Sequence, residues 1–382
     1  MSAIPATTTI NVRAEQLVAL ALRCLPRMYQ AERGLFCFKM VERDGQMVPV
    51  DVSTRYTAMV ILGLQSAVTC GQTVPWPMEH LLDGLLAQTQ STRALGDLGL
   101  ILWATTVCDP ARAKPVLAEI EHRWPSEVNQ ADSNLETIQL AWLISGLCKY
   151  LVAVPNDPRA QALLTSGYDR LVKWHYCQQT NLFYYCSCAA HALRLRLLKP
   201  VCFFAEQVYG MQALAFYAEL MQTEHARTLA VKTADLMVAR QTGKGGWCWL
   251  YNTDTAAVVD VYPLYTVHQL GMGPMALLPL AGPQTGRLVA AVQRGIEWVY
   301  GANEHGRSLL DPQLDVIWRS IKPRVLPRQR QQFHKALAIG HLPAFGTDAS
   351  RAPNTLQIDY ETRPYEYGWW LYALSAAAKK TT

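Results

Sequence analysis

The segment TAMVILGLQSAV (57–68) decides the fold class of this 382-residue chain. Nearly every position is apolar, so a helix over these residues has no polar face and has to be buried on all sides. Four more segments have the same character: LGLILWATTV (98–107), TIQLAWLISGL (137–147), QALAFYA (212–218) and YGWWLYALSAA (367–377).

Amphipathic segments separate these apolar ones. In 158–177, for example, Leu164, Tyr168 and Leu171 recur at helical spacing with charged residues between them, which is typical of a helix that buries one face. We predict helices at 12–30, 54–69, 76–90, 93–107, 111–123, 133–151, 158–177, 203–221, 223–240, 261–280, 284–301 and 364–378. Outer amphipathic and inner apolar helices alternate six times, so we predict an all-α (α/α)6 toroid.

A short repeat supports this alternation. Gln30-x3-Gly34-x-Phe36 follows the first outer helix, and Gln241-x3-Gly245-x-Trp247 follows the fifth. After the fourth outer helix a degenerate copy, Gln178-Gln-Thr-Asn181-Leu-Phe183, has asparagine in place of glycine. Asparagine tolerates positive φ better than most residues, so we expect each turn to need a left-handed residue there. The aromatic residue would then fix the returning loop to the core.

These features resemble the helical toroids of terpenoid cyclases, protein prenyltransferases, uronate epimerases and many polysaccharide lyases and hydrolases. The Q-x3-G-x-W element is similar to the glutamine–tryptophan repeat of triterpene cyclases. The resemblance implies the architecture over most of the chain, but it selects no single family and no reaction.

Two segments depart from the helical pattern. Residues 36–52 contain an Asp44-Gly45 turn between alternating runs, which predicts a small N-terminal hairpin. Residues 303–359 are long and rich in proline, and they precede the last inner helix. We predict that they form an insertion or flap over one mouth of a single 1–382 domain, because long ordered insertions are frequently functional.

Composition excludes several classes of protein. Charged residues make up 17% of the chain, the net charge is +5, and basic residues are scattered, so we predict no nucleic-acid partner. No apolar run reaches the length of a transmembrane span, and the start of the chain lacks the pattern of a secretory signal, so we expect a cytoplasmic protein. The sequence leaves the oligomeric state open.

No cofactor or metal site is predicted. The chain contains neither a phosphate-binding loop nor a dinucleotide fingerprint. Its ten cysteines include no C-x-x-C pair. Cys177, Cys186, Cys188 and His191 form a C-x8-C-x-C-x2-H spacing, which is not a common zinc pattern.

Polar residues gather where the inner helices begin, which is where the cavity of a toroid opens. Helix capping accounts for some of them, and Ser133…Glu136 fits a capping box. Capping does not account for the convergence of so many polar residues on one mouth. Paired carboxylates in a half-buried cleft suit general acid–base chemistry, and arginines clamp anionic sugars. We predict the catalytic residues Glu136, Glu206, Asp260, Tyr265, His268 and Glu366. We predict the substrate-binding residues Asp51, Arg55, Tyr56, Asp97, Trp249, Tyr251, Arg363 and Tyr365.

Two of these expectations are geometric. Glu136, Glu206, Asp260 and Glu366 all stand at inner-helix starts, so we expect them to share one cavity. Pro263 suits a first helical turn, so Tyr265 and His268 should project from one helix face into the mouth. There a histidine with a pKa near neutrality would exchange a proton with the substrate.

We therefore predict a carbohydrate-active enzyme that acts on a glycan or a saccharide containing uronic acid, as an epimerase, lyase or hydrolase. Two alternatives stay open. One is a terpenoid cyclase-like enzyme with an aromatic cavity, although Asn252-Thr-Asp254-Thr-Ala only partly matches the acidic box of the triterpene family. The other is a non-catalytic binding protein on the same fold. A wet cleft with carboxylates favours sugars, and a dry aromatic cavity favours isoprenoids.

Overall fold

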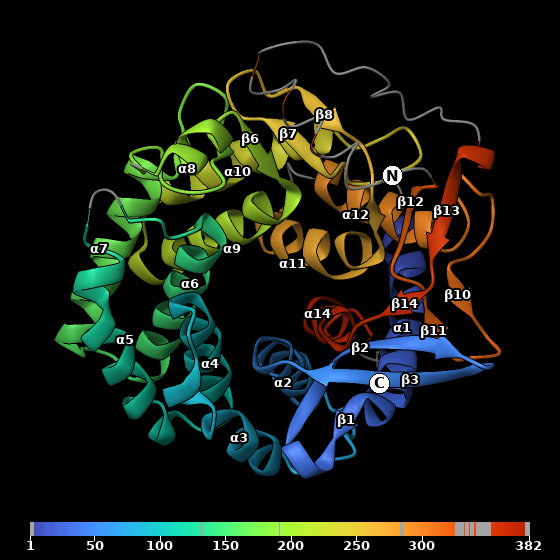
Figure 1. The fold of residues 1–382 in the computed structure, drawn as a ribbon, viewed down its shortest axis with the longest axis horizontal. Helices are drawn as coiled ribbons and strands as arrows, with labels where there is room; N and C mark the ends of the chain where they lie inside the picture. The colour runs from blue at the N-terminus through green and yellow to red at the C-terminus, as the bar shows by residue number, and fades with distance from the viewer. Residues whose placement is uncertain are drawn as a thin grey trace.

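A computed structural model describes residues 4–130, 133–190, 192–282, 286–324 and 353–378, together with residues 332, 336 and 340. Its helices form two concentric rings, seen end-on in Figure 1. The outer ring consists of α1 (Ile4–Met28), α3 (Met78–Leu86), α5 (Lys114–Glu127), α7 (Pro158–Trp174), α10 (Glu224–Ala239) and α12 (Gly286–Val299). The inner ring consists of α2 (Thr54–Thr69), α4 (Leu95–Cys108), α6 (Thr137–Ala153), α9 (Phe204–Met221), α11 (Gly273–Leu277) and α14 (Pro364–Leu374). The predicted (α/α)6 toroid is confirmed.

The inner ring closes because its last helix, α14, packs against its first, α2. Glycines set how near these helices lie. A Cβ atom on Gly63 of α2 would stand 2.1 Å from the backbone oxygen of Gly368 in α14, and one on Gly146 of α6 would stand 2.3 Å from the oxygen of Gly99 in α4. A real Cβ atom cannot occupy either position, so these two contacts depend on glycine.

The repeated turns have the conformation that the sequence predicts. Gly34, Asn181 and Gly245 all adopt positive φ, at 64°, 60° and 94°. The aromatic residues that follow them, Phe36, Phe183 and Trp247, have no exposed surface. The glutamine also has a role: the Gln241 amide donates to the backbone oxygens of Gly245 and Ala291, at 2.8 and 3.0 Å, and so joins the turn to α12.

Short strands lie at the end of the toroid where the inner helices begin. The predicted hairpin is present as β2 (Leu35–Arg43) and β3 (Gln46–Val52), and β2 also pairs with β1 (Tyr29–Gln30) and β14 (Glu361–Thr362). Four further pairs are β4 (Tyr176–Cys177) with β5 (Leu182–Phe183), β6 (Val201–Phe203) with β7 (Leu250–Asn252), β7 with β8 (Val258–Asp260), and β10 (Leu310–Asp311) with β11 (Val316–Ile317).

The described part of the predicted flap joins this end of the toroid. Its strand β12 (Ser320–Pro323) lies between β13 (Leu356–Asp359) and β9 (Leu264–Tyr265), all antiparallel. The flap is thereby tied to the segment that leads into the fifth inner helix. Most of the residues between 325 and 352 lie outside the described part of the chain.

The short helix α8 (Leu193–Leu198) is an addition that the helical pattern did not predict.

Two local predictions are wrong. Helical structure in the fifth inner segment starts at Thr266 and passes through a π-helical turn, η4 (His268–Met272), into α11. Pro263 precedes it after a cis peptide bond and Tyr265 belongs to β9, so Pro263 does not begin the helix. Ser133 and Glu136 form no capping box either, because the Ser133 hydroxyl accepts from Leu135 N–H instead.

Candidate functional site

The starts of the inner helices are connected by side-chain contacts that follow the mouth of the toroid. Arg55 at the start of α2 forms two hydrogen bonds with Asp97 at the start of α4, at 2.6 and 3.3 Å. The same guanidinium lies over the ring of Trp142 in α6, 5.1 Å from its centroid. Three neighbouring inner helices therefore meet at one arginine.

The first and last inner helices meet through aromatic rings. Tyr56 of α2 stacks on Tyr365 of α14 with centroids 4.4 Å apart, and Phe38 of β2 also stacks on Tyr56, at 5.4 Å. Arg363 donates to the Tyr56 hydroxyl at 3.0 Å and lies over the Phe38 ring at 4.6 Å. The predicted binding residues Tyr56, Arg363 and Tyr365 thus form one partly buried layer together with Phe38, which was not predicted.

A cluster of charges continues from Arg363 toward the flap. Glu361 binds Arg363 at 2.7 Å, Arg319 at 3.2 Å and Lys39 at 3.1 Å. Arg319 also lies 3.4 Å from Glu366 and above the ring of Tyr265, at 4.8 Å. Burial disfavours the ionised form of Glu361, but the positive charges of Arg319 and Arg363 favour this form more strongly. The pKa of Glu361 is therefore lowered. We call Lys39, Arg319, Glu361, Arg363 and Glu366 the charged cluster.

Glu366 lies at the back of the charged cluster and has no exposed surface. Its carboxylate accepts from the backbone N–H of Arg363 at 3.3 Å, as the last member of a capping box does. Burial raises the pKa of Glu366 to about 7, although Arg319 and Arg363 act in the opposite direction. This carboxylate holds Arg319 and the start of α14, and it does not face the open mouth.

His268 lies below an aromatic layer. Its ring stacks on Trp249 at 5.9 Å and contacts Tyr265 at 5.1 Å and Phe204 at 4.8 Å. Burial, and then the charge of Arg319, lower the pKa of His268 to about 3, so the imidazole is neutral at pH 7. The expected near-neutral pKa is wrong, because a buried imidazolium beside an arginine has lost its hydration. Trp249 and Tyr265 keep part of their surface exposed and cover the histidine.

Glu136 is the predicted catalytic carboxylate that retains exposed surface. It stands directly before α6 and accepts a short hydrogen bond from the hydroxyl of Tyr185. The Tyr185 ring meets Phe203 at 6.0 Å, and Phe203 meets Trp249 at 4.9 Å, so this pair joins the mouth on the side of α9. Burial and then the Glu136 carboxylate raise the pKa of Tyr185, which keeps the phenol protonated.

The four carboxylates expected in one cavity are not equivalent. Glu206 and Asp260 are 1% and 2% exposed, and Glu366 is not exposed. Glu206 accepts from Phe203 N–H at 2.5 Å and caps α9, while Asp260 in β8 accepts from Tyr262 N–H at 3.1 Å. These three buried carboxylates fix backbone where inner helices and strands begin, and the sharing of one cavity by all four stays a prediction.

Two predicted binding residues are placed elsewhere. Tyr251 in β7 is completely buried, so it offers no stacking face. Asp51 is exposed, adopts positive φ and pairs with Arg33 after α1, at the outside of this end of the toroid. The Asn252-Thr-Asp254 segment forms a turn in which Asn252 accepts from the N–H groups of Asp254 and Thr255, so it serves the loop between β7 and β8.

A cavity of about 340 Å³ opens beside the stacked rings. Arg55, Tyr56 and Asp97 line it, as do Phe38 and Arg93. The lining also includes four residues with hydroxyl groups, Ser53, Thr54, Ser91 and Thr92. The combination of aromatic faces, guanidinium groups and hydroxyls is suited to a polyhydroxylated ligand with an acidic group.

Several residues that hold the mouth together were not predicted from the sequence. Arg319 stands in the apolar run Val316-Ile-Trp-Arg-Ser-Ile, where a lone arginine between buried neighbours is the signal that could have identified it. Glu361 lies two residues before Arg363, which was predicted. Tyr185 directly follows the degenerate Asn181 turn, and Phe38 and Lys39 lie in the hairpin. None of these positions stands at an inner-helix start.

Within the described residues, no group of three histidine, cysteine or acidic side chains lies close enough to hold a metal ion. His191, the last member of the cysteine–histidine spacing, lies outside these residues. The described helices also include none that is long and apolar enough to cross a membrane.

The chain matches no protein-family model and no curated protein by sequence. Solved structures do share its architecture. An unsaturated glucuronyl hydrolase specific for heparin aligns over 97% of both chains with a TM-score of 0.60 and 12% identity. A cellobiose 2-epimerase from Bacillus thermoamylovorans B4167 aligns over 97% of this chain and 99% of its own, with a TM-score of 0.62 and 8% identity. An α-1,6-mannanase from Salegentibacter sp. HEL1_6 aligns over 96% and 99%, with a TM-score of 0.60 and 10% identity. At these identities the similarity establishes the toroid fold.

Proposed function

We propose that this chain is an enzyme that acts on a saccharide containing uronic acid, bound at the mouth where the inner helices begin. The observation that carries the proposal is the charge of the cluster at this mouth. Three cations, Lys39, Arg319 and Arg363, face two carboxylates, and the pKa of one of these, Glu366, is raised to about 7. Among the described residues of the cluster, positive charge is therefore in excess.

An excess of arginine charge in a half-buried mouth attracts a carboxylate, and a guanidinium binds it through two parallel N–H groups. Arg363 is the arginine best placed for this, because its side chain is 17% exposed and is already oriented by Glu361 and the Tyr56 hydroxyl. Arg319 is 11% exposed and lies deeper. Its charge supports Arg363, while Glu366 acts as a positioning residue for Arg319.

Aromatic surfaces flank this charge. Tyr56 and Tyr365 present stacked rings on one side, and Trp249 and Tyr265 present half-exposed rings on the other. Such faces suit the apolar face of a sugar ring. The cavity lined by Arg55, Tyr56 and Asp97 adds hydroxyl and guanidinium partners for a neighbouring ring.

For proton transfer we propose Glu136 with Tyr185. The carboxylate is half-buried, and the phenol beside it is kept protonated, so one group can accept a proton while the other donates one. This pairing replaces the earlier assignment of proton transfer to His268, whose lowered pKa makes it a poor base. It is compatible with an epimerase, a lyase or a hydrolase.

The neighbours with this fold support a saccharide more than an isoprenoid, since their names describe a glucuronyl hydrolase, a mannanase and a cellobiose epimerase. The charged cluster also argues against the cyclase-like alternative, because an isoprenoid cavity is dry and apolar. A binding protein without catalysis would keep the mouth but not depend on Glu136.

The test is incubation of the purified chain with galacturonate and glucuronate oligosaccharides, followed by proton NMR in D₂O. Hydrolysis, elimination and epimerisation each give distinct new signals. We expect turnover by the unmodified chain and loss of at least 100-fold in Glu136→Gln, with the melting temperature unchanged. Equal turnover by Glu136→Gln would reject the proposed proton transfer, and binding without turnover would favour the non-catalytic alternative.

A further inference from the structure

The cavity of about 340 Å³ beside Tyr56 carries one charge that its described lining does not balance. Arg55 and Asp97 neutralise each other through their hydrogen bonds at 2.6 and 3.3 Å. Arg93 also lines the cavity and is exposed, and within the described part of the chain its side chain forms no ion pair and no hydrogen bond. The described lining therefore has a net positive charge, which comes from Arg93.

Two inner helices begin at this cavity. Ser53 directly precedes α2 and Ala94 directly precedes α4, and both residues belong to the lining. The start of a helix carries partial positive charge from backbone N–H groups that have no partner within the helix. Ala94 has no side-chain acceptor for these groups in α4. The two helix starts therefore act in the same direction as Arg93 and favour an anionic group in the cavity.

An arginine of the outer ring holds the segment that carries Arg93. Arg123 of α5 donates to the backbone oxygens of Thr92 and Arg93, at 2.8 and 2.5 Å, and to the carboxylate of Glu127 at 2.7 Å. Its side chain is 17% exposed, and Arg123 does not belong to the described lining of the cavity. Arg123 thus fixes the backbone from which the Arg93 side chain extends.

The same end of α5 connects this segment to the pair proposed for proton transfer. The backbone oxygen of Glu127 accepts a hydrogen bond from the hydroxyl of Ser133, and this hydroxyl accepts from Leu135 N–H at 3.2 Å. Leu135 directly precedes Glu136. Because one end of an outer helix holds both segments, the separation between Arg93 and Glu136 is set by the fold.

Tyr56 connects the cavity to the charged cluster. It belongs to the lining of the cavity, and its hydroxyl accepts from Arg363 at 3.0 Å. A ring bound in the cavity would therefore lie next to the arginine proposed to bind the first carboxylate.

From these observations we propose that the cavity beside Tyr56 binds a second uronate ring of the same saccharide, with the carboxylate of that ring on Arg93. Arg123 is the positioning residue for Arg93. The inference rests on the proposed function, since it requires one uronate ring at Arg363. It names the substrate class as a saccharide with acidic groups on more than one ring. A guanidinium binds a carboxylate through two parallel N–H groups, and the hydroxyl groups of the lining are suited to those of the ring.

The test is calorimetric titration of the full chain with a galacturonate trisaccharide and with its fully methyl-esterified form. Arg93→Ala should weaken binding of the acidic trisaccharide by about tenfold or more, because a charge-assisted contact is lost. The affinity for the ester should stay within about twofold, because the ester offers no charge to the guanidinium.

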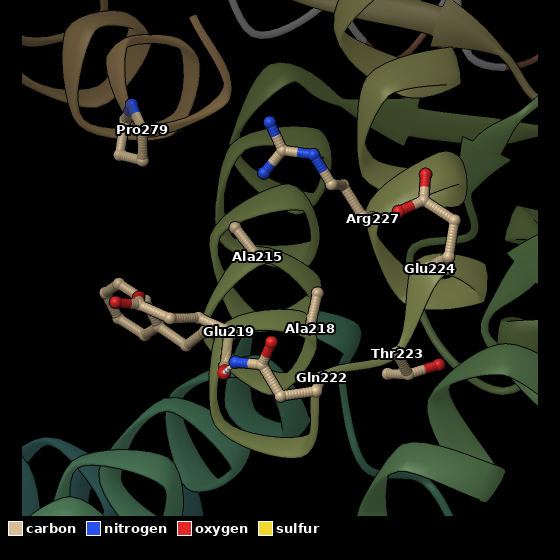
Figure 2. A pocket seen from close by; sticks show the side chains of 9 residues that line it. Ala215, Ala218, Glu219, Gln222, Thr223, Glu224, Arg227 and Pro279 are labelled. Carbon is tan, nitrogen blue, oxygen red and sulfur yellow. Dashed lines mark hydrogen bonds between the residues drawn. The ribbon is translucent and has the colours of Figure 1, made fainter. Parts of the chain in front are cut away.

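Two exposed cations of α10 provide matched controls, Arg227→Ala and Lys232→Ala. Arg227 lines a separate cavity of about 590 Å³ between the end of α9 and the start of α10, at the opposite end of the toroid (Figure 2). Each control removes one positive charge away from the mouth, so both variants should bind the acidic trisaccharide as the unmodified chain does.

A cycle of variants tests the positioning role of Arg123. Arg123→Met should weaken binding of the acidic trisaccharide when Arg93 is present and have no further effect in Arg93→Ala, because its effect passes through Arg93. Arg123→Lys, which keeps the charge but loses the planar fork, should weaken binding less. An equal loss with and without Arg93 would show that Arg123 only supports the fold and would overturn its positioning role.

Arg363→Ala separates this inference from the proposed function. If Arg363→Ala weakens binding of the acidic trisaccharide and Arg93→Ala does not, the second-ring site is overturned and the proposed function stands. Equal weakening of the acid and the ester in Arg93→Ala would also overturn it. If Arg93→Ala binds more weakly while Arg363→Ala binds as the unmodified chain does, the contact at Arg363 fails instead. No binding by the unmodified chain at millimolar concentration would overturn both.

Discussion

Arg319 and Glu366 form a largely buried ion pair, 3.4 Å apart, between the flap and the start of the last inner helix. The guanidinium of Arg319 lies over the ring of Tyr265, and the carboxylate of Glu366 accepts a hydrogen bond from the backbone N–H of Arg363. It therefore orients a charge at the mouth and fixes the start of α14. Four predictions concern this pair and the parts of the toroid that support it.

Replacing Arg319 with Met should destabilise the fold strongly. Glu366 would remain buried without its partner, and breaking a buried pair costs about 3–5 kcal/mol. Chemical denaturation should show this loss. Arg319→Lys, which keeps a charge but loses the planar fork, should fall between the two proteins. If Arg319→Met unfolds at the same denaturant concentration as the unmodified chain, the pair contributes nothing to stability.

Glu366 should make stability depend on pH. Its pKa is about 7 in the folded chain and about 4.5 when unfolded, so the folded state binds more protons between these values. The free energy of unfolding contributed by this group is therefore highest below pH 4.5 and declines as pH rises through 7, by about 3 kcal/mol in total. Glu366→Gln should remove this slope.

The unmodified chain has to be compared with Glu366→Gln, because His268 changes the free energy of unfolding with pH in the opposite direction. Its pKa of about 3 lies below the unfolded value, so its contribution is complete above pH 6.5 and is lost as pH falls toward 3. The free energy of unfolding should be measured by denaturation at pH 5 and pH 8. Its change between these two pH values should differ between the unmodified chain and Glu366→Gln. Parallel curves would mean that Glu366 is ionised throughout.

His268→Ala should behave as a core substitution. The ring is 3% exposed and packed by Phe204, Trp249 and Tyr265, so its loss leaves a cavity and should cost about 1–3 kcal/mol. Turnover per folded molecule should be kept. A stable His268→Ala variant without turnover would restore the catalytic assignment that the sequence suggested.

The contact between Gly99 and Gly146 tests the closeness of the inner ring. Gly146→Ala would place a methyl group 2.3 Å from a backbone oxygen, so we expect a loss of about 3 kcal/mol despite the better helix propensity of alanine. Gly243→Ala is the matched control, because a Cβ atom there meets nothing within 4 Å. Equal melting temperatures for the two variants would show that the ring relaxes around the methyl group.

The sequence predicted the helices well because an inner helix of a toroid has a signal of its own. Residues 57–68 and 98–107 are apolar on every side, and the amphipathic segments between them define the outer ring. The glycine or asparagine of each repeated turn was also predictable, since positive φ restricts the choice of residue. These are local properties, and the structure confirms them.

The candidate site was predicted less completely, because it depends on contacts between distant segments. Arg55 and Asp97 belong to successive inner helices, and both were among the predicted binding residues, but their ion pair was not predicted. Arg319 reaches Glu366 across 47 residues and Tyr185 reaches Glu136 across 49, and neither Arg319 nor Tyr185 stands at a helix start. Burial was the other difficulty: Glu206, Asp260 and Tyr251 have suitable chemistry but lie almost entirely out of reach of solvent.

The central claim, that the mouth binds an acidic saccharide through its arginines, is tested most directly by titrating the full chain with a galacturonate trisaccharide. The unmodified chain should bind it, and raising the salt concentration should weaken binding because the attraction is electrostatic. Arg363→Ala should bind at least about tenfold more weakly, while Lys232→Ala should bind as the unmodified chain does. Equal affinity of Arg363→Ala and the unmodified chain, or no binding by either at millimolar concentration, would contradict the account.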